Sequence, residues 1–90
     1  MIEIVKIVEV KPLGGHSVFV RFSNGDEGIS DFSWLGAATG AMVEPLADEE
    51  FFSRVFLSNG VLTWPNGFDV DSIALHREMA EQGRLRRTAA

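Results

Sequence analysis

Residues 64–69 (WPNGFD) hold the densest set of side chains suited to molecular recognition in this 90-residue chain. Trp64 and Phe68 supply apolar rings, and Asn66 and Asp69 supply an amide and a carboxylate beside them. Aromatic rings next to polar groups suit the binding of a peptide or a small molecule, so these four residues are candidate binding residues. In the alternative interpretation Trp64 belongs to the core, and the two polar side chains bond the backbone of a turn.

The sequence offers no set of side chains with the spacing of a catalytic centre or a metal site. His16 and His76 lie far apart, and neither has a metal-ligand spacing or a nucleophile motif beside it. The carboxylates of residues 48–50 (DEE) are explained by the capping and the dipole of a helix. Asp69 and Asp71 lie in an extended segment and supply too few oxygens for a hard cation, which needs about six or more. We therefore expect no enzymatic activity, no catalytic residue, no metal and no cofactor.

Arg84, Arg86 and Arg87 form a basic cluster near the C-terminus and are candidate contacts for a partner protein or for nucleic acid. In the alternative interpretation they place cations favourably after the C-terminal end of a helix. Three arginines would contact about three phosphates, which gives weak and salt-sensitive binding. Because the chain carries a net charge of -5 at pH 7, we expect no specific DNA binding by this chain alone.

Length and composition indicate one domain, predicted over residues 1–83, followed by a basic tail over residues 84–90 that is expected to fray. Hydrophobic residues at 46% and charged residues at 23% are typical of a soluble globular chain. No apolar run is long enough to span a membrane. The absence of cysteine fits a reducing compartment, so we expect a cytoplasmic protein without membrane contact.

Short strands joined by tight turns are the elements that position these residues. Alternating apolar and polar side chains predict strands over residues 2–11 and 16–23 and a later hairpin over residues 55–64. Asn24-Gly25 favours a two-residue type I′ turn, because both of its central residues need positive φ. Such a turn places Val20 opposite Ile29 on the apolar face of the first hairpin.

The second hairpin turns at Asn59-Gly60, which places Leu57 opposite Leu62. Trp64 ends this hairpin opposite Val55, and we expect it to be largely buried and to anchor the sheet against the final helix.

Two helices are predicted from their capping residues. Asp48 begins a helix of about two turns. Asp71 or Ser72 begins a final helix, which ends at Gly83 because glycine readily adopts the left-handed conformation of a helix end. The predicted fold is α+β, a small antiparallel sheet of hairpins with one short and one C-terminal helix.

The order of these motifs resembles the bacterial family known as domain of unknown function 2442. The resemblance extends over about residues 3–78 and is carried by the segments 22–28 (FSNGDEG), 31–33 (DFS), 44–48 (EPLAD) and 64–70 (WPNGFDV), together with Leu35 and Phe51. Its most specific part is the Trp-Pro-Asn-Gly-x-Asp hexapeptide. Phe68 stands where relatives more often have a small residue, and the last helix lacks an aromatic residue often found near Leu75.

The resemblance implies no established activity. Some relatives carry an added helix-turn-helix, and many are encoded beside another small protein, in pairs described as toxin–antitoxin modules. Because only about 20 residues follow Ser72, we expect no helix-turn-helix in this chain.

We expect a non-enzymatic protein-interaction module, the antitoxin-like or accessory half of a two-gene pair. It would bind a small protein partner through an aromatic-edged turn or an exposed sheet edge. The alternative is a small-molecule-binding domain that uses the Trp64–Asp69 turn as a pocket wall. We also expect a homodimer through the strand over residues 2–10.

Overall fold

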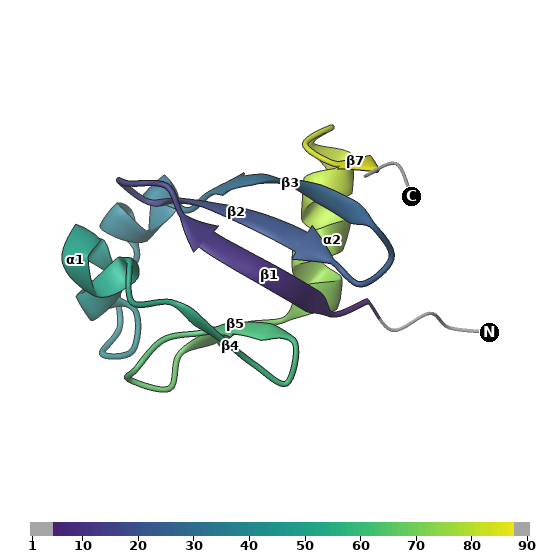
Figure 1. Cartoon of the computed structure of the whole chain (residues 1–90). Coiled ribbons are helices and arrows are strands. Elements are labelled where there is room, and N and C mark those ends of the chain that lie inside the picture. The colour runs from purple at the N-terminus through teal and green to yellow at the C-terminus, as the bar shows by residue number, and fades with distance from the viewer. Residues whose placement is uncertain (1–4, 88–90) are drawn as a thin grey trace.

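The computed structural model describes residues 5–87, which form two antiparallel sheets and a long C-terminal helix (Figure 1). The larger sheet has the order β1-β2-β3-β7, with β1 (Ile7–Pro12), β2 (Ser17–Phe22), β3 (Asp26–Asp31) and β7 (Arg86–Arg87). The smaller sheet has the order β4-β5-β6, with β4 (Phe56–Ser58), β5 (Val61–Thr63) and β6 (Asp69–Val70). The helices are η1 (Ser33–Ala37), η2 (Glu44–Ala47), α1 (Glu49–Phe52) and α2 (Ser72–Glu81). The predicted α+β fold is confirmed.

The core lies between one face of the larger sheet and the elements packed beneath it. Val18, Val20 and Phe22 alternate along β2 and are fully buried, and Leu75 and Met79 of α2 belong to the same cluster. In Figure 1 α2 lies behind the sheet, and no helix covers the face turned toward the viewer. One face of the larger sheet is therefore left open, and we call it the outer face.

The first hairpin differs from its predicted register by one residue. Val20 lies opposite Gly28, and Ile29 lies on the outer face with 48% of its surface exposed. The reason is a three-residue loop over residues 23–25, in which the N–H of Gly25 (φ 94°) donates to the Phe22 carbonyl at 3.0 Å. The predicted two-residue turn was therefore wrong, because a type I turn followed by a left-handed glycine connects these strands equally well.

The second hairpin has the predicted register, with Leu57 opposite Leu62. Asn59 and Gly60 both have positive φ, at 53° and 78°, as a type I′ turn requires. The hairpin also joins the two sheets, because the Ile7 N–H donates to the Gly60 carbonyl at 2.8 Å.

The predicted caps of both main helices are present. The Asp48 side chain accepts the Glu50 N–H, although α1 has one turn and not two. The Asp71 side chain accepts the Ala74 N–H and begins α2. At the other end of α2, Gly83 (φ 69°) reverses the chain.

The basic tail was predicted over residues 84–90, and the part of it that the structure describes contacts the larger sheet. Arg86 pairs with Glu27 and Arg87 with Asp26, so β7 extends the larger sheet at β3. Gly28 allows this approach, because a Cβ there would collide with the Arg84 carbonyl. Residues 88–90 lie outside the described residues.

Candidate functional site

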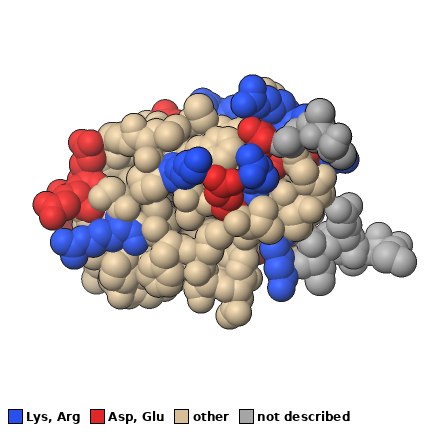
Figure 2. Space-filling view, viewed as in Figure 1, with Lys and Arg blue, Asp and Glu red and all other residues tan. Residues whose placement is uncertain are grey.

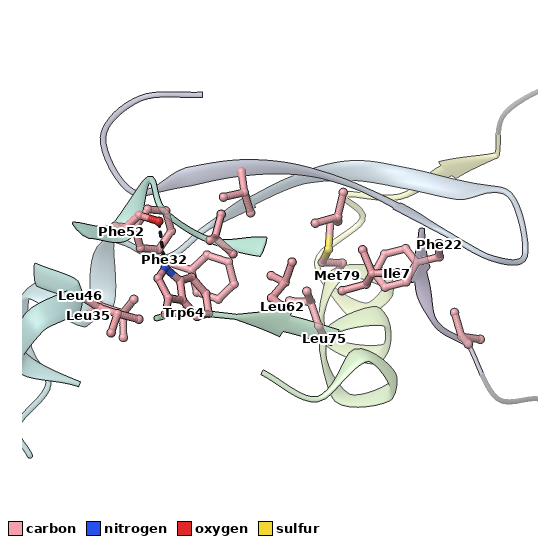
Figure 3. Close-up of a cluster of buried hydrophobic side chains, with 14 residues drawn as sticks. Ile7, Phe22, Phe32, Leu35, Leu46, Phe52, Leu62, Trp64, Leu75 and Met79 are labelled. Atoms are coloured by element: carbon pink, nitrogen blue, oxygen red, sulfur yellow. Dashed lines mark hydrogen bonds between the residues drawn. The ribbon is translucent and has the colours of Figure 1, made fainter. Parts of the chain in front are cut away.

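Trp64 lies in the core and not on the surface. It is 1% exposed, and its indole N–H donates to the Phe52 carbonyl at 2.9 Å (Figure 3). The surrounding rings belong to Phe32, Phe52 and Phe68, with centroids 5.4–6.3 Å away. The expected burial is confirmed. In Figure 3 Trp64 lies beside Phe32 and Phe52, and Leu75 and Met79 of α2 lie farther along the same cluster, so its packing against the final helix stays a prediction.

The polar groups of the 64–69 turn mostly bond backbone. The Asn66 amide donates to the Met42 carbonyl at 2.9 Å, and its oxygen accepts the Phe68 N–H at 3.2 Å. The bond to Met42 connects the turn to the loop before η2, and the bond from Phe68 lies within the turn. Phe68 is half-buried, and Asp69 is exposed. Of the four predicted binding residues, only Asp69 is fully at the surface, while Trp64 and Asn66 hold the fold together.

Each histidine has a short polar contact with a residue distant in the sequence. Nε2 of His16 lies 2.8 Å from the Leu46 carbonyl, which links the start of β2 to η2. Nε2 of His76 lies 2.7 Å from Oδ2 of Asp26, which links α2 to the first hairpin. Neither was predicted to have a functional role, and both contacts are structural cross-links.

Asp26 is the centre of a polar cluster formed with Asn24, His76 and Arg87. Besides His76, it accepts hydrogen bonds from the Asn24 amide and from Nε of Arg87, each at 3.1 Å. The hydrogen bond from His76, supported by Arg87 and Asn24, lowers the pKa of Asp26 below its usual value, against a smaller opposing effect of burial. Sequence reasoning missed this cluster, because no local spacing relates the first hairpin to α2.

A row of alternating charges crosses the outer face of the larger sheet (Figure 2). Glu9 lies 3.2 Å from Lys11 and 2.7 Å from Arg21. Glu27 lies 3.5 Å from Arg21 and 3.3 Å from Arg86. These pairs connect all four strands, so each charge in the row has an opposite charge beside it.

A groove of about 450 Å³ lies beside this charged row, between β3 and the chain that leaves α2. We call it the β3 groove, and it is lined by Phe19, Gly28, Ile29, Gly83, Arg84, Leu85 and Arg86. Phe19, Ile29 and Leu85 give it apolar surface, while Arg84 and Arg86 provide cations. Arg86 is paired with Glu27, whereas Arg84 has no ion pair among the described residues.

The β3 groove thus contains two of the three arginines that the sequence singled out. Arg87 is held instead by Asp26, on the other side of β7. The apolar part of the groove was not predicted, because the expected register placed Ile29 opposite Val20 on the apolar face. Its one sequence signal is Gly28, a glycine within a strand, which often marks the close approach of another backbone.

Two classes of site are absent from the part of the chain that the structure describes. Within residues 5–87, no three His, Asp or Glu side chains are grouped so that they could hold a metal ion. No helix in the same range has the length and apolar character needed to cross a bilayer.

Comparison with protein-family models gives a match over most of the chain. A family model described as "Protein of unknown function (DUF2442)" matches residues 7–80. Neither a curated protein nor a solved structure matches the chain. The matched range contains the 64–69 turn and the β2–β3 side of the β3 groove, whereas Arg84 and Arg86 lie beyond it.

Proposed function

The chain belongs to the DUF2442 family, and we propose that it is a non-enzymatic protein-interaction module whose binding surface is the β3 groove. The observation that carries this proposal is the combination of exposed apolar side chains and arginines on a face that no helix covers. Ile29 is 48% exposed, and Arg84 beside it has no ion pair among residues 5–87. Apolar contacts next to arginine are common at the centres of protein interfaces.

The role expected from the family resemblance is part of this proposal. The partner is a small protein encoded beside the chain, and the chain is the antitoxin-like or accessory member of the pair. We place this pairing in the cytoplasm. The expected homodimer stays a prediction, and it is supported by the position of β1 at the edge of the larger sheet.

A small-molecule site is the second candidate, because the β3 groove has the volume of common ligand pockets. Such pockets usually measure roughly 300–1,000 Å³, and this one measures about 450 Å³. Arg84 and Arg86 would favour an anionic ligand with an apolar body. The 64–69 turn, which the sequence indicated as the pocket wall, is not among the residues that line this groove.

Co-purification with the product of the neighbouring gene tests the proposed function. We expect the tagged chain to retain that protein, and the substitution Ile29→Glu to reduce the retained amount at least tenfold. The matched control is Trp34→Glu, which changes another exposed apolar side chain (55% exposed) outside the β3 groove. Equal retention by Ile29→Glu, or an equal loss with Trp34→Glu, would contradict the proposal.

A further inference from the structure

We infer that the β3 groove binds an extended segment of the partner, which adds to the free edge of β3 as a further strand and carries acidic side chains between apolar ones. This inference rests on the proposed function and specifies the chemistry of the partner. It depends on three features of the groove: the backbone of β3, the side chains beside it, and the charge at one end.

The backbone of β3 is covered by a neighbouring strand along only part of its outer edge. The Phe32 N–H donates to the His16 carbonyl at 2.7 Å, which sets the alternation of hydrogen bonds between β2 and β3. In an antiparallel pair with this alternation, Ile29 and Asp31 direct their N–H and C=O groups away from β2. Among the described residues, β7 pairs only with Asp26 and Glu27, so no strand covers this part of the edge. An open edge of this kind accepts an added strand.

The side chains beside this edge favour an apolar residue in the added strand. Ile29 lies opposite Phe19 on the outer face, and both line the groove. A residue of the added strand placed opposite Ile29 would direct its side chain to the same face, where these two side chains can bury it. Leu85 adds apolar surface from the C-terminal segment.

The charge at the β7 end of the groove favours acidic residues in the same strand. Arg84 has no ion pair among residues 5–87, and the side chain of Arg86 is 81% exposed although it contacts Glu27. Figure 2 shows blue atoms gathered at the upper right, over β7 and the end of α2. Carboxylates bind arginine through charge-assisted hydrogen bonds. Asp31 lies at the far end of the free edge, and its pKa is lowered by hydrogen bonding to Ser33 and, more weakly, by the charge of Arg84. The acidic residue of the added strand therefore belongs at the β7 end, two positions from the apolar residue, so that both side chains share the outer face.

Titration with a synthetic peptide tests strand addition directly. The probe is acetyl-Val-Thr-Glu-Thr-Val-amide, in which the Glu and the two Val side chains share one face of the strand, and it is added to the isotope-labelled chain and followed by amide NMR and hydrogen exchange. We expect shifts that concentrate on β3 and the C-terminal segment, and at least tenfold slower exchange of the Ile29 and Asp31 amides. The same peptide with N-methylated backbone amides should bind at least tenfold more weakly, because it cannot complete the hydrogen bonds of the ladder.

Charge variants test the second half of the inference. We expect Arg84→Glu to weaken binding of the peptide about fivefold to tenfold, in the range of a reversed surface charge pair. Arg54→Glu reverses another exposed arginine outside the groove and should leave the affinity unchanged. The lysine counterpart, acetyl-Val-Thr-Lys-Thr-Val-amide, should bind more weakly than the acidic peptide to the native chain and regain affinity for Arg84→Glu.

Several results would overturn the inference. They are equal binding of the N-methylated or lysine peptide, shifts centred away from β3, or no binding at millimolar concentration. Dimerisation of the chain through this edge, abolished by Arg84→Glu, would also overturn the assignment to a separate partner. If the neighbouring protein is still lost with Ile29→Glu while the peptide fails, the strand geometry is wrong and the proposed function stands.

Discussion

Oδ2 of Asp26 lies 2.7 Å from Nε2 of His76, although 50 positions separate the two residues in the chain. This contact fastens α2 to the first hairpin beneath the larger sheet. Because Asp26 also binds Arg87 of β7, one carboxylate holds together three elements that meet at the β3 groove. The position of the candidate binding surface therefore depends on an interaction outside it.

The pH dependence of the free energy of unfolding should reveal how much the Asp26 carboxylate stabilises the fold. Its pKa is lower in the folded chain than its usual value of 3.8, so ionised Asp26 stabilises the fold above about pH 4. That contribution is lost as the pH falls through the folded-state pKa. Asp26→Asn should lower the free energy of unfolding by about 1 kcal/mol at pH 7, and the difference from the native chain should shrink below pH 4. Urea unfolding at several pH values measures both.

The matched control for Asp26 is Asp69→Asn, at an exposed carboxylate in the smaller sheet. Asp69→Asn should change the free energy of unfolding little, both at pH 7 and below pH 4. A constant difference between Asp26→Asn and the native chain from pH 7 to pH 2 would contradict the role of the ionised carboxylate.

Gly28→Ala should displace the C-terminal segment. A Cβ at this position collides with the Arg84 carbonyl and comes within 3.1 Å of Cε of Met79. We expect a loss of about 1–3 kcal/mol, as for other overpacked sites, with faster hydrogen exchange at β7. Gly36→Ala is the control, because a Cβ there meets nothing within 4 Å. Similar stability of the two variants would show that β7 is not docked as described.

The two hairpin glycines should differ in their tolerance of alanine. Gly25 (φ 94°) has open space, with only Cγ of Arg87 at 3.9 Å, so Gly25→Ala should cost about 1 kcal/mol from backbone strain. At Gly60 (φ 78°) a Cβ would also lie 2.7 Å from Cβ of Lys6, so the cost should be about 2–3 kcal/mol. Denaturant unfolding measures the loss of stability in both variants. A larger loss for Gly25→Ala than for Gly60→Ala would contradict the prediction.

The two tryptophans should report different environments by fluorescence. In Trp34→Phe, the remaining emission comes from buried Trp64 and should shift strongly to the red on unfolding. In Trp64→Phe, it comes from Trp34, which is 55% exposed, and should shift little. Trp64→Ala should cost about 3–5 kcal/mol, the usual loss for a deleted core aromatic. A small spectral shift for Trp34→Phe would contradict the burial of Trp64.

A mobility-shift titration at physiological salt should show no sequence-specific DNA binding by the isolated chain. Arg86 and Arg87 are paired with Glu27 and Asp26, and these carboxylates would repel phosphate. Sub-micromolar binding that depends on the DNA sequence would contradict this expectation.

The sequence by itself determined the features that depend on neighbouring residues. The caps at Asp48 and Asp71, the turn at Asn59-Gly60 and the alternation along β2 all follow from interactions across a few positions. The burial of Trp64 was also expected from its size and apolar character. The length of the first hairpin loop could not be predicted, because Asn-Gly fits loops of two and of three residues. One extra residue in the loop shifts the pairing of all the residues in the two strands.

Only the tertiary structure decided where the candidate binding surface, the β3 groove, lies. No local pattern in the sequence predicts a strand at Arg86 and Arg87. These residues form β7 because β3 has an unpaired edge and two carboxylates that bind their side chains. The need for glycine at position 28 likewise arises from Arg84, 56 positions later in the chain. These contacts join residues that are far apart in the sequence and become neighbours only when the chain folds back. Their contribution to stability depends on distances in space, which the spacing of residues along the sequence does not specify.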